Sequence, residues 1–584
     1  MTALLDVDWL TVDDIPDTWA ECEQIRQQRV AWRQAPPNVR MWTNPADGFE
    51  DDGVAFVGSC ADNVSGSFPW RNKITDPGTG TLRLRTDHPV ARWLFQVAIT
   101  TDNSITKANT IITVDHMGGT KRWSGLLKNW KLVKDASGVR YVDCTFIDDL
   151  QYFQYTLCPP NPVLPIEVFQ WPRDFPVFGP SKWCISLLYL LQLIRINGNL
   201  WNIPSDPFDL SSWDALFDWS SWQTFIMADP FDLDDSSLDT FFGVRMDRFD
   251  QAVADSMEAA QLTMTYRRIL TVDGETCPVP GVPTCRNGAC VFQVVDNSGY
   301  FAPAGTGTAG ALALGISRTV TEFLEGGIET ILVPTTDAEN IQPEEYYIPG
   351  WQGTMPAFPW VSVIDGPYTS IETSELTYSP ATAGSVIVGG DNPLADNLAN
   401  LTIEAVGDIA GFLLSGGFVD NAGDIAASVI YPFIVGTIAA WDQVTNNSRV
   451  HNLGWVHLPE ILGQGANNNS WSLSAIMAFS AAFTLTAAQT AHTFTLGGSD
   501  AHLPGVDYDI GTRISSTDLE ITNVLFVDQV EQMVLAWDYS QNRPPDYEVQ
   551  VGNSDAKLTQ AQRIARLMAK MSAYASDVGV HLIS

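Results

Sequence analysis

The chain has 584 residues, enough for roughly two to four domains with a large core. It carries 68 acidic and 32 basic residues, for a net charge of -36. This excess argues against a protein that holds nucleic acid through phosphate contacts, because such binding needs clustered Lys and Arg. An acidic shell of the halophilic kind is the alternative, and the long apolar and Trp-rich stretches count against it.

The N-terminal segment, residues 1–52, has no basic stretch followed by an apolar core, so it does not resemble a signal peptide. We therefore expect synthesis in a reducing cytoplasm. The eight cysteines are scattered and form no CxxC pair, and the only cluster is Cys277, Cys285 and Cys290. A zinc site there would lack a nearby fourth ligand. Buried thiols or one disulfide are the favoured interpretations.

Residues 53–155 are predicted to form strands. "GTLRLRT" alternates apolar and polar residues, "ANTIITVDH" is β-branched, "MGGT" and "DASG" are turns, and "VRYVDCTFI" returns. Trp123 and Trp130 lie on the strand between the two turns. Period two places them on opposite faces unless a bulge intervenes. They are predicted to be wall residues of a small barrel or sandwich rather than a flat stacking platform.

Residues 156–260 are predicted to be an insertion. It begins with a Pro-rich extended stretch and continues with "SKWCISLLYLLQLIRI", a buried or interface helix with Ser181 as candidate N-cap. Its apolar run is too short to span a bilayer. An Asp- and aromatic-rich part follows, with "DPFDL" starting at both Asp206 and Asp229. Two copies are too few for a solenoid, so a surface insertion is expected.

Strand patterns return at 261–300 and at 505–552, on either side of a Gly/Ala-rich insertion, 301–504, in which apolar helices are expected. The stretch 470–500 has a helical pattern. The run 425–441, "IAASVIYPFIVGTIAAW", has no charge, but Pro432 and the flanking Asp424 and Asp442 argue against a membrane span. Buried or oligomer-interface structure is favoured, and transient membrane contact is the alternative.

The C-terminal segment, 553–584, is predicted to contain a basic amphipathic helix over 555–576, capped by Ser554. Its apolar stripe must be buried, and a chain this acidic offers acidic partners, so docking onto another subunit or another protein is expected. Packing within its own chain is the alternative. The candidate interface residues of this helix and of the run 425–441 are Lys557, Arg563, Arg566, Lys570, Ile430, Phe433 and Ile434.

No catalytic, cofactor-binding or metal-binding residues are predicted. Nucleophile elbows, phosphate loops, HExxH and EF-hand motifs are absent from the sequence, and "GTGTAG" at 305–310 lacks the lysine of a phosphate loop. The adjacent Asp148 and Asp149 could be a glycosidase carboxylate pair, but neighbouring residues point apart, so capping of the following "LQYF" turn is preferred. The spacings of His451, His457, His492 and His502 match no metal site, and scattered structural histidines are favoured.

The strand motifs occur in a characteristic order. "GTLRLRTDHPVARWL", "VDHMGGTKRWSGLLKNWKL", "YVDCTFIDDLQYF", "NPVLPIEVFQWP" and "FGPSKW" come first, followed by "FQVVDNSGYF", "VDYDIGTRIS" and "TNVLFVDQVEQMVLAWD". Together they resemble the tail-tip hub, often labelled minor tail protein, of long-tailed phages that infect actinobacteria, which is related to the baseplate hubs of myophages. The insertions 201–250 and 301–400 depart from the family pattern.

The resemblance implies a mainly β fold with α+β insertions. Two small hub-type β-barrels are expected per chain, 53–155 and 261–300 with 505–552, plus helical and irregular insertions and the C-terminal helix. It implies a homotrimer at the distal end of the virion tail, without enzymatic activity or cofactors. Its partners would be the distal tail protein hexamer, the tape measure protein, other minor tail proteins and the host cell envelope.

The implied function is to join the distal tail ring to the tape measure protein and to form the channel end for DNA ejection. A receptor-binding or cell-wall glycan-degrading tail protein is the alternative, because Trp and Asp are abundant. In the first case DNA passes without specific binding, and part of the acid excess is expected to line its route, where a negative wall repels phosphates. The same charge on the outer surface would only aid solubility.

Overall fold

The computed structural model covers the whole chain. The residues that it describes are 15–44, 53–99, 109–162, 175–198, 219–228, 235, 237, 239–297, 300–301, 331–334, 355–356, 361–366, 369, 371–389, 441–463, 486, 489–496, 502–518 and 524–552.

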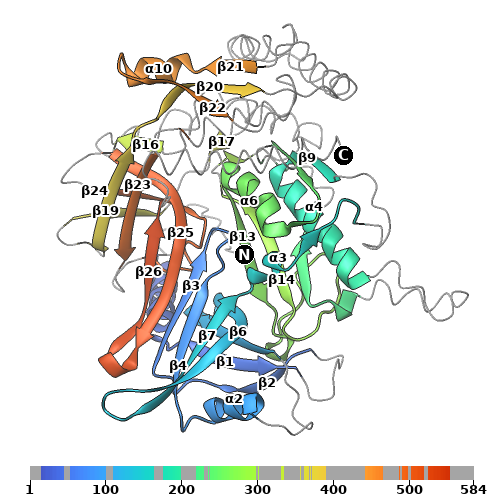
Figure 1. Cartoon of the computed structure of the whole chain (residues 1–584). Helices are drawn as coiled ribbons and strands as arrows, with labels where there is room; N and C mark the ends of the chain where they lie inside the picture. Colours follow the sequence, from blue (N-terminus) through green and yellow to red (C-terminus); the bar gives the residue numbers. More distant parts are fainter. Residues whose placement is uncertain are drawn as a thin grey trace, which may run out of the picture.

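The largest element is a 12-stranded sheet, with the strand order β18-β24-β25-β3-β4-β7-β6-β5-β1-β2, while β16 and β26 also pair with β25. The long strand β25, from near the C-terminus, stands beside β3 of the N-terminal region (Figure 1). The strands are β1 (Asn38–Thr43), β2 (Ala55–Ser59), β3 (Ser65–Arg71), β4 (Thr79–Arg85), β5 (Thr110–His116), β6 (Lys121–Lys134), β7 (Arg140–Asp148), β16 (Ile331–Pro334), β18 (Ser362–Asp365), β24 (Arg513–Asp518), β25 (Val524–Asp538) and β26 (Arg543–Val551).

The expected strands of 53–155 are confirmed, and their alternation explains the core. On β4, Leu82 and Leu84 are buried while the arginines between and after them face outward. Trp123 on β6 is fully buried, with its ring centroid 4.9 Å from that of Phe68. The register of β6 against β7 shifts between Leu127 and Asn129. This bulge lies between the two tryptophans, and the partly buried Trp130 packs against the same core cluster as Trp123.

A second core lies under a three-stranded sheet of order β10-β14-β13. Helices α4 and α6 pack against this sheet (Figure 1). Phe153, Tyr189, Phe249 and Phe292 are fully buried and form its aromatic centre, with neighbouring ring centroids 4.5 to 5.8 Å apart. The elements here are α3 (Gln151–Gln154), β8 (Leu157–Cys158), β9 (Phe175–Pro180), α4 (Ser181–Leu193), η2 (Ile194–Gly198), η4 (Trp219–Ser221), β10 (Thr224–Met227), β11 (Asp239–Val244), β12 (Asp247–Arg248), α6 (Phe249–Ala259), β13 (Leu262–Arg268), η5 (Thr271–Asp273) and β14 (Cys290–Asp296).

The predicted helix from 181 exists, but Ser181 is its first helical residue and not its N-cap. Pro180 holds the N-cap position and offers no side-chain hydrogen bond. A distant segment supplies the cap instead: Ser237 Oγ accepts from the Lys182 amide at 3.1 Å, and Asp235 accepts from the Trp183 amide at 3.1 Å.

Two helices flank the large sheet where none was predicted. The first, α1 (Ile15–Gln34), is largely polar and exposed. The second, α2 (Pro89–Ile99), interrupts the run of strands in 53–155 and buries Val90, Ala91 and Leu94 in the core. Proline at its first position suits a helix start, because the missing N–H would have no helical partner there.

The region 301–504 is mostly strand in its described residues. The helical pattern expected over 470–500 fails at Gln489–Leu496, which forms β23 against β19 (Ile371–Ser379), because "HTFTL" alternates in the manner of a strand. A small sheet, β21-β20-β22, carries one short helix. The further elements here are β15 (Tyr300–Phe301), β17 (Met355–Pro356), β20 (Ala383–Gly389), β21 (Trp441–Thr445), α10 (Asn447–Leu453) and β22 (Leu458–Gly463). Outside this region, η8 (Tyr539–Gln541) lies between β25 and β26.

The two expected barrels are not seen as closed sheets in the described part of the chain. The large sheet is an open path that ends at β18 and at β2. The ranges 261–300 and 505–552, expected in one barrel, contribute their strands to different sheets, because β25 pairs with β3 while β13 pairs with β14. The coarser prediction of a mainly β fold with helices is confirmed.

Three of the predictions concern residues that the structure does not describe. The run 425–441 up to Ala440, both "DPFDL" copies and the C-terminal helix lie outside the described residues. No helix within the described ranges is long and apolar enough to cross a bilayer.

Candidate functional site

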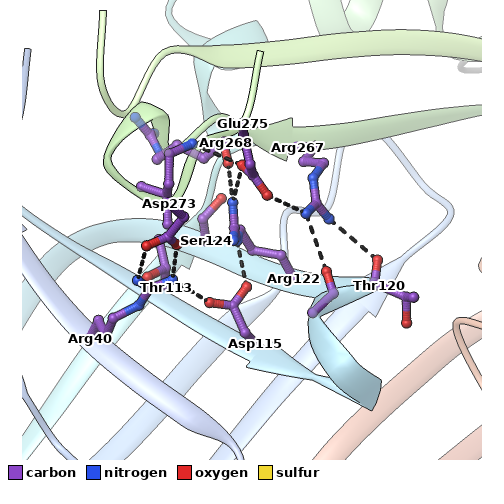
Figure 2. Close-up of polar contacts among 12 residues, drawn as sticks. Arg40, Thr113, Asp115, Thr120, Arg122, Ser124, Arg267, Arg268, Asp273 and Glu275 are labelled. Atoms are coloured by element: carbon purple, nitrogen blue, oxygen red, sulfur yellow. Dashed lines mark hydrogen bonds and ion pairs between the residues drawn. The ribbon is translucent and has the colours of Figure 1, made fainter. Parts of the chain in front are cut away.

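Among the described residues, a set of paired and largely buried charges lies at the junction between the large sheet and the β10-β14-β13 sheet. Figure 2 shows it in close-up, with Arg40, Asp115 and Arg122 projecting from β1, β5 and β6 of the large sheet. They face Arg267 and Arg268 at the end of β13, and the turn that follows β13, which carries Asp273 and Glu275 (Figure 2). We call these residues, together with Asp149, the junction cluster.

Arg40 joins one side of the junction to the other. Its guanidinium donates to both carboxylate oxygens of Asp273, at 3.0 and 2.8 Å, and to Asp115 at 2.7 Å. Asp115 also binds Arg122, so a single carboxylate on β5 aligns two arginines from its neighbouring strands. The bidentate pairing of Arg40 with Asp273 fixes the relative orientation of the two side chains as well as their distance.

Arg122 and Glu275 form the middle of the junction cluster. The Arg122 guanidinium donates to Glu275 and to the Arg268 carbonyl, both at 2.7 Å. Glu275 also accepts from Arg267 at 2.6 Å and from the Leu270 amide at 2.8 Å. Arg267 in turn donates to the carbonyls of the 117–120 turn before β6. The turn after β13 is thus bound to β6 at several points.

Arg268 and Asp149 are the most deeply buried pair, with side-chain exposures of 3% and 0%. The Arg268 guanidinium contacts both Asp149 oxygens and donates to the Gly288 carbonyl at 2.7 Å. Ser124 donates its hydroxyl to the same carboxylate. Since Asp149 follows β7 and Ser124 lies on β6, the pair holds β13 against the end of the large sheet.

The junction cluster is electrically balanced, with four arginines and four carboxylates. Burial alone would lower the pKa of the Arg268 guanidinium, but the neighbouring groups, with Asp149 first among them, together raise it well above its ordinary value. The hydrogen bond from Arg40 lowers the pKa of Asp273, although partial burial opposes this. Buried charges are tolerated only when they are paired and hydrogen-bonded, as they are here. These paired charges suit a junction that holds the two sheets rigidly together.

Asp148 and Asp149 do not form a glycosidase pair. Asp148 accepts from the Gly78 amide at 2.7 Å and from the Leu150 amide at 3.1 Å, where it begins the turn that leads into α3. Burial raises the pKa of Asp148 well above its ordinary value. Because Asp149 is engaged by Arg268 and Ser124, the two carboxyls have separate structural partners, as the capping interpretation predicted.

A cavity of about 150 Å³ lies beside the junction cluster and is bordered by both sheets. Gly53 and Asn287 pair across its rim, where Gly288 lies so close to Val54 that a Cβ atom would meet it at 2.4 Å. Asn287 donates to the Val54 carbonyl, but its buried Oδ1 atom has no protein partner. The cavity is lined by Asn44, Gly53, Val54, Asn109, Ile111, Leu126, Tyr152, Ser221, Trp222, Gln223, Arg268, Arg286, Asn287, Gly288 and Ala289.

All eight cysteines are described, and none is joined to another in a disulfide. Burial, with Cys277 as neighbour, raises the pKa of Cys285 to about 12, and Cys290 is buried on β14. Of the four singled-out histidines, His492 is buried and bonded to Ser516. Among the described residues, no group of three or more His, Cys, Asp or Glu side chains is placed to hold a metal ion.

All seven predicted interface residues lie outside the described residues, so their role stays a prediction. The junction cluster itself was missed by the sequence analysis. Its only signal was the unusual position of bases within strand patterns, as in "TKRWSG" and "TYRRIL", in a chain with few bases. Their carboxylate partners are up to 233 residues away in sequence, so the pattern alone could not pair them.

The fold and the junction define a mainly β protein whose buried charges hold its parts together. The chain belongs to the family described as "Siphovirus ReqiPepy6 Gp37-like protein", whose model matches residues 50–553. Two relatives are minor tail proteins Gp28 of mycobacteriophages. The D29 protein is 28% identical, with 94% of this chain and 95% of that protein aligned. The L5 protein is 27% identical, with 84% of this chain and 87% of that protein aligned. The resemblance to minor tail proteins of actinobacterial siphophages is confirmed.

Among solved structures, a tail protein from Neisseria meningitidis MC58 aligns with 89% of this chain and 97% of its own, at 8% identity and a TM-score of 0.39. The E. coli c3393 protein, described as a component of the type VI secretion system, aligns with 85% of this chain and 74% of its own, at 6% identity and a TM-score of 0.27.

Proposed function

We propose that this phage tail protein is a structural component of the distal tail tip, in the role of a baseplate hub. It joins the distal tail ring to the tape measure protein and forms the end of the channel for DNA ejection. The observation that carries the proposal is the nearly end-to-end match to minor tail proteins, which covers 94% of this chain. The balanced and largely buried junction cluster supports it, because a hub must keep its parts in fixed orientation under load.

The assembled state in this proposal is a homotrimer. Each chain contributes two β-rich units, the large sheet and the β10-β14-β13 sheet with its helices, so three chains offer six units to a sixfold ring. The C-terminal helix with Lys557, Arg563, Arg566 and Lys570, and the apolar run with Ile430, Phe433 and Ile434, are proposed contacts to other tail subunits. Part of the acid excess lines the route of the DNA.

A phage with an amber mutation in this gene tests the role. Non-suppressing hosts should yield heads and no complete tails, and suppressed virions should contain three copies for every six of the distal tail protein by quantitative mass spectrometry. Complete, infectious tails that lack the protein would reject the proposal, and six or one copies would reject the trimer. Release of sugar from host cell wall by the pure protein would favour a glycan-degrading tail protein.

A further inference from the structure

One basic feature stands out on this acidic chain, the hairpin formed by the outer halves of β6 and β7. Residues 128–140 contain Lys128, Lys131, Lys134 and Arg140 and a single acid, Asp135. The hairpin therefore has a net charge of +3, which leaves -39 for the rest of the chain. All four basic side chains are exposed.

The hairpin bases are free within the described structure, unlike most bases around them. Arg83 and Arg85, on the adjacent strand β4, each pair with an aspartate. Lys131 lies opposite Asp143 in the register, but Arg83 already holds that carboxylate through two hydrogen bonds at 2.7 and 3.0 Å. Lys134 lies directly opposite Arg140, a like-charge pair that destabilises an isolated hairpin.

The single acid of the hairpin is occupied by the turn. The Asp135 carboxylate accepts from the Ser137 hydroxyl at 2.6 Å and from the Val139 amide at 2.9 Å, and Gly138 takes the positive φ of 89° that closes the turn. The hydrogen bond from Ser137 lowers the pKa of Asp135. The tip is thus well formed, and its carboxylate is engaged away from the four bases.

The hairpin also offers a strand edge and apolar surface. In the described residues, β5 pairs with β6 only as far as Leu126, so the outer edge of β6 beyond that point has no neighbouring strand. Leu132 and Val139 are 50% and 40% exposed among the bases. Where the hairpin leaves the sheet, Trp130 packs against Phe95 of α2, with the two ring centroids 5.8 Å apart. In Figure 1 the hairpin extends past the sheet at the lower left.

We propose that this hairpin docks on the acidic surface of a second copy of the chain. Charge complementarity favours that partner, because the hairpin carries a net charge of +3 and exposes Leu132 and Val139, while the rest of every copy carries -39. The inference rests on the proposed homotrimer and names one of its contacts. The four bases then gain carboxylate partners, which they lack among the described residues of their own chain.

The test compares two triple variants of the full-length protein, Lys128→Glu with Lys131→Glu and Lys134→Glu, and the matched Lys→Arg set. All three side chains are exposed, so equal urea midpoints should show that folding is unchanged. By sedimentation, the Glu variant should self-associate about tenfold more weakly than wild type, while the Arg variant keeps wild-type affinity. Wild-type association should also weaken as salt rises.

A second readout locates the contact. When isotope-labelled and unlabelled chains are mixed, zero-length carbodiimide cross-linking should join hairpin lysines of one chain to carboxylates of the other. If the lysines only guard a strand edge against aggregation, glutamates would guard it equally well, and association would not change.

Association of the Glu variant equal to wild type would overturn the hairpin contact and leave the trimer standing. A wild-type protein that stays monomeric, both in solution and in tails, would overturn both. Salt-dependent binding of labelled duplex DNA that the Glu variant loses, with self-association unchanged, would identify the hairpin as a polyanion site instead.

Discussion

Replacement of Arg268 by Met should strongly destabilise the junction. The side chain of Arg268 is 3% exposed, and it supplies two contacts to the fully buried Asp149 carboxylate and one to the Gly288 carbonyl. Methionine has similar length but no charge, so Asp149 would lose both guanidinium contacts and keep only neutral donors such as the Ser124 hydroxyl. Removal of one partner of such a buried pair costs about 3–5 kcal/mol.

The assay is urea unfolding followed by tryptophan fluorescence, for which Trp222 is a natural reporter because it is buried and lines the cavity beside Arg268. Arg543→Met is the matched control. Its partner is Glu548 at 2.8 Å, but the side chains of this pair are 51% and 48% exposed, so the loss should be about 1 kcal/mol or less.

A second replacement tests the physical cause. Adding Asp149→Leu to Arg268→Met removes the uncompensated charge and should recover most of the lost stability. Equal unfolding free energies for Arg268→Met and Arg543→Met would refute the argument that the buried pair holds the junction. A double variant less stable than Arg268→Met would show that packing, and not charge, dominates there.

Three further predictions concern single side chains. Burial lowers the pKa of His116 from 6.5 to about 4. The free energy of unfolding should therefore fall by up to about 3 kcal/mol as the pH drops from 6.5 toward 4, because the unfolded chain binds a proton that the buried imidazole does not. In urea titrations, His116→Gln should lack this part of the pH dependence. Trp123→Ala should cost about 3–5 kcal/mol in the same assay and the partly buried Trp130→Ala clearly less, and equal losses would contradict the core described here. Exposed Cys22 should react with iodoacetamide in the native protein well before Cys60, where burial raises the pKa to about 12, and peptide mass spectrometry should show that order.

The sequence predicts well where a strand is decided by its own residues. Alternation identified β4, and β-branched residues identified β5. The spacing of Trp123 and Trp130 predicts opposite faces unless a bulge intervenes. The register shift between Leu127 and Asn129 is such a bulge. The helix α1 has no such signal, because its sequence is largely polar and its few apolar residues do not form a stripe at helical spacing.

The sequence did not predict which strands pair or which charges form ion pairs, because both depend on contacts between distant segments. Nothing local in β25 says that it pairs with β3 rather than with β13. Arg268 could be seen as a base within a strand, but its pairing with Asp149, 119 residues earlier, follows only from the packing of two sheets. The same limit applies to the helix cap that Asp235 and Ser237 provide for α4.

A cryo-electron microscopy reconstruction of the intact tail tip tests the central claim most directly. The account predicts three copies of this chain in a ring between the distal tail protein and the tip, with the two sheets of each copy in the mutual orientation that the junction cluster fixes. Copies distributed along the tail tube, or a tip ring built from another protein, would contradict it.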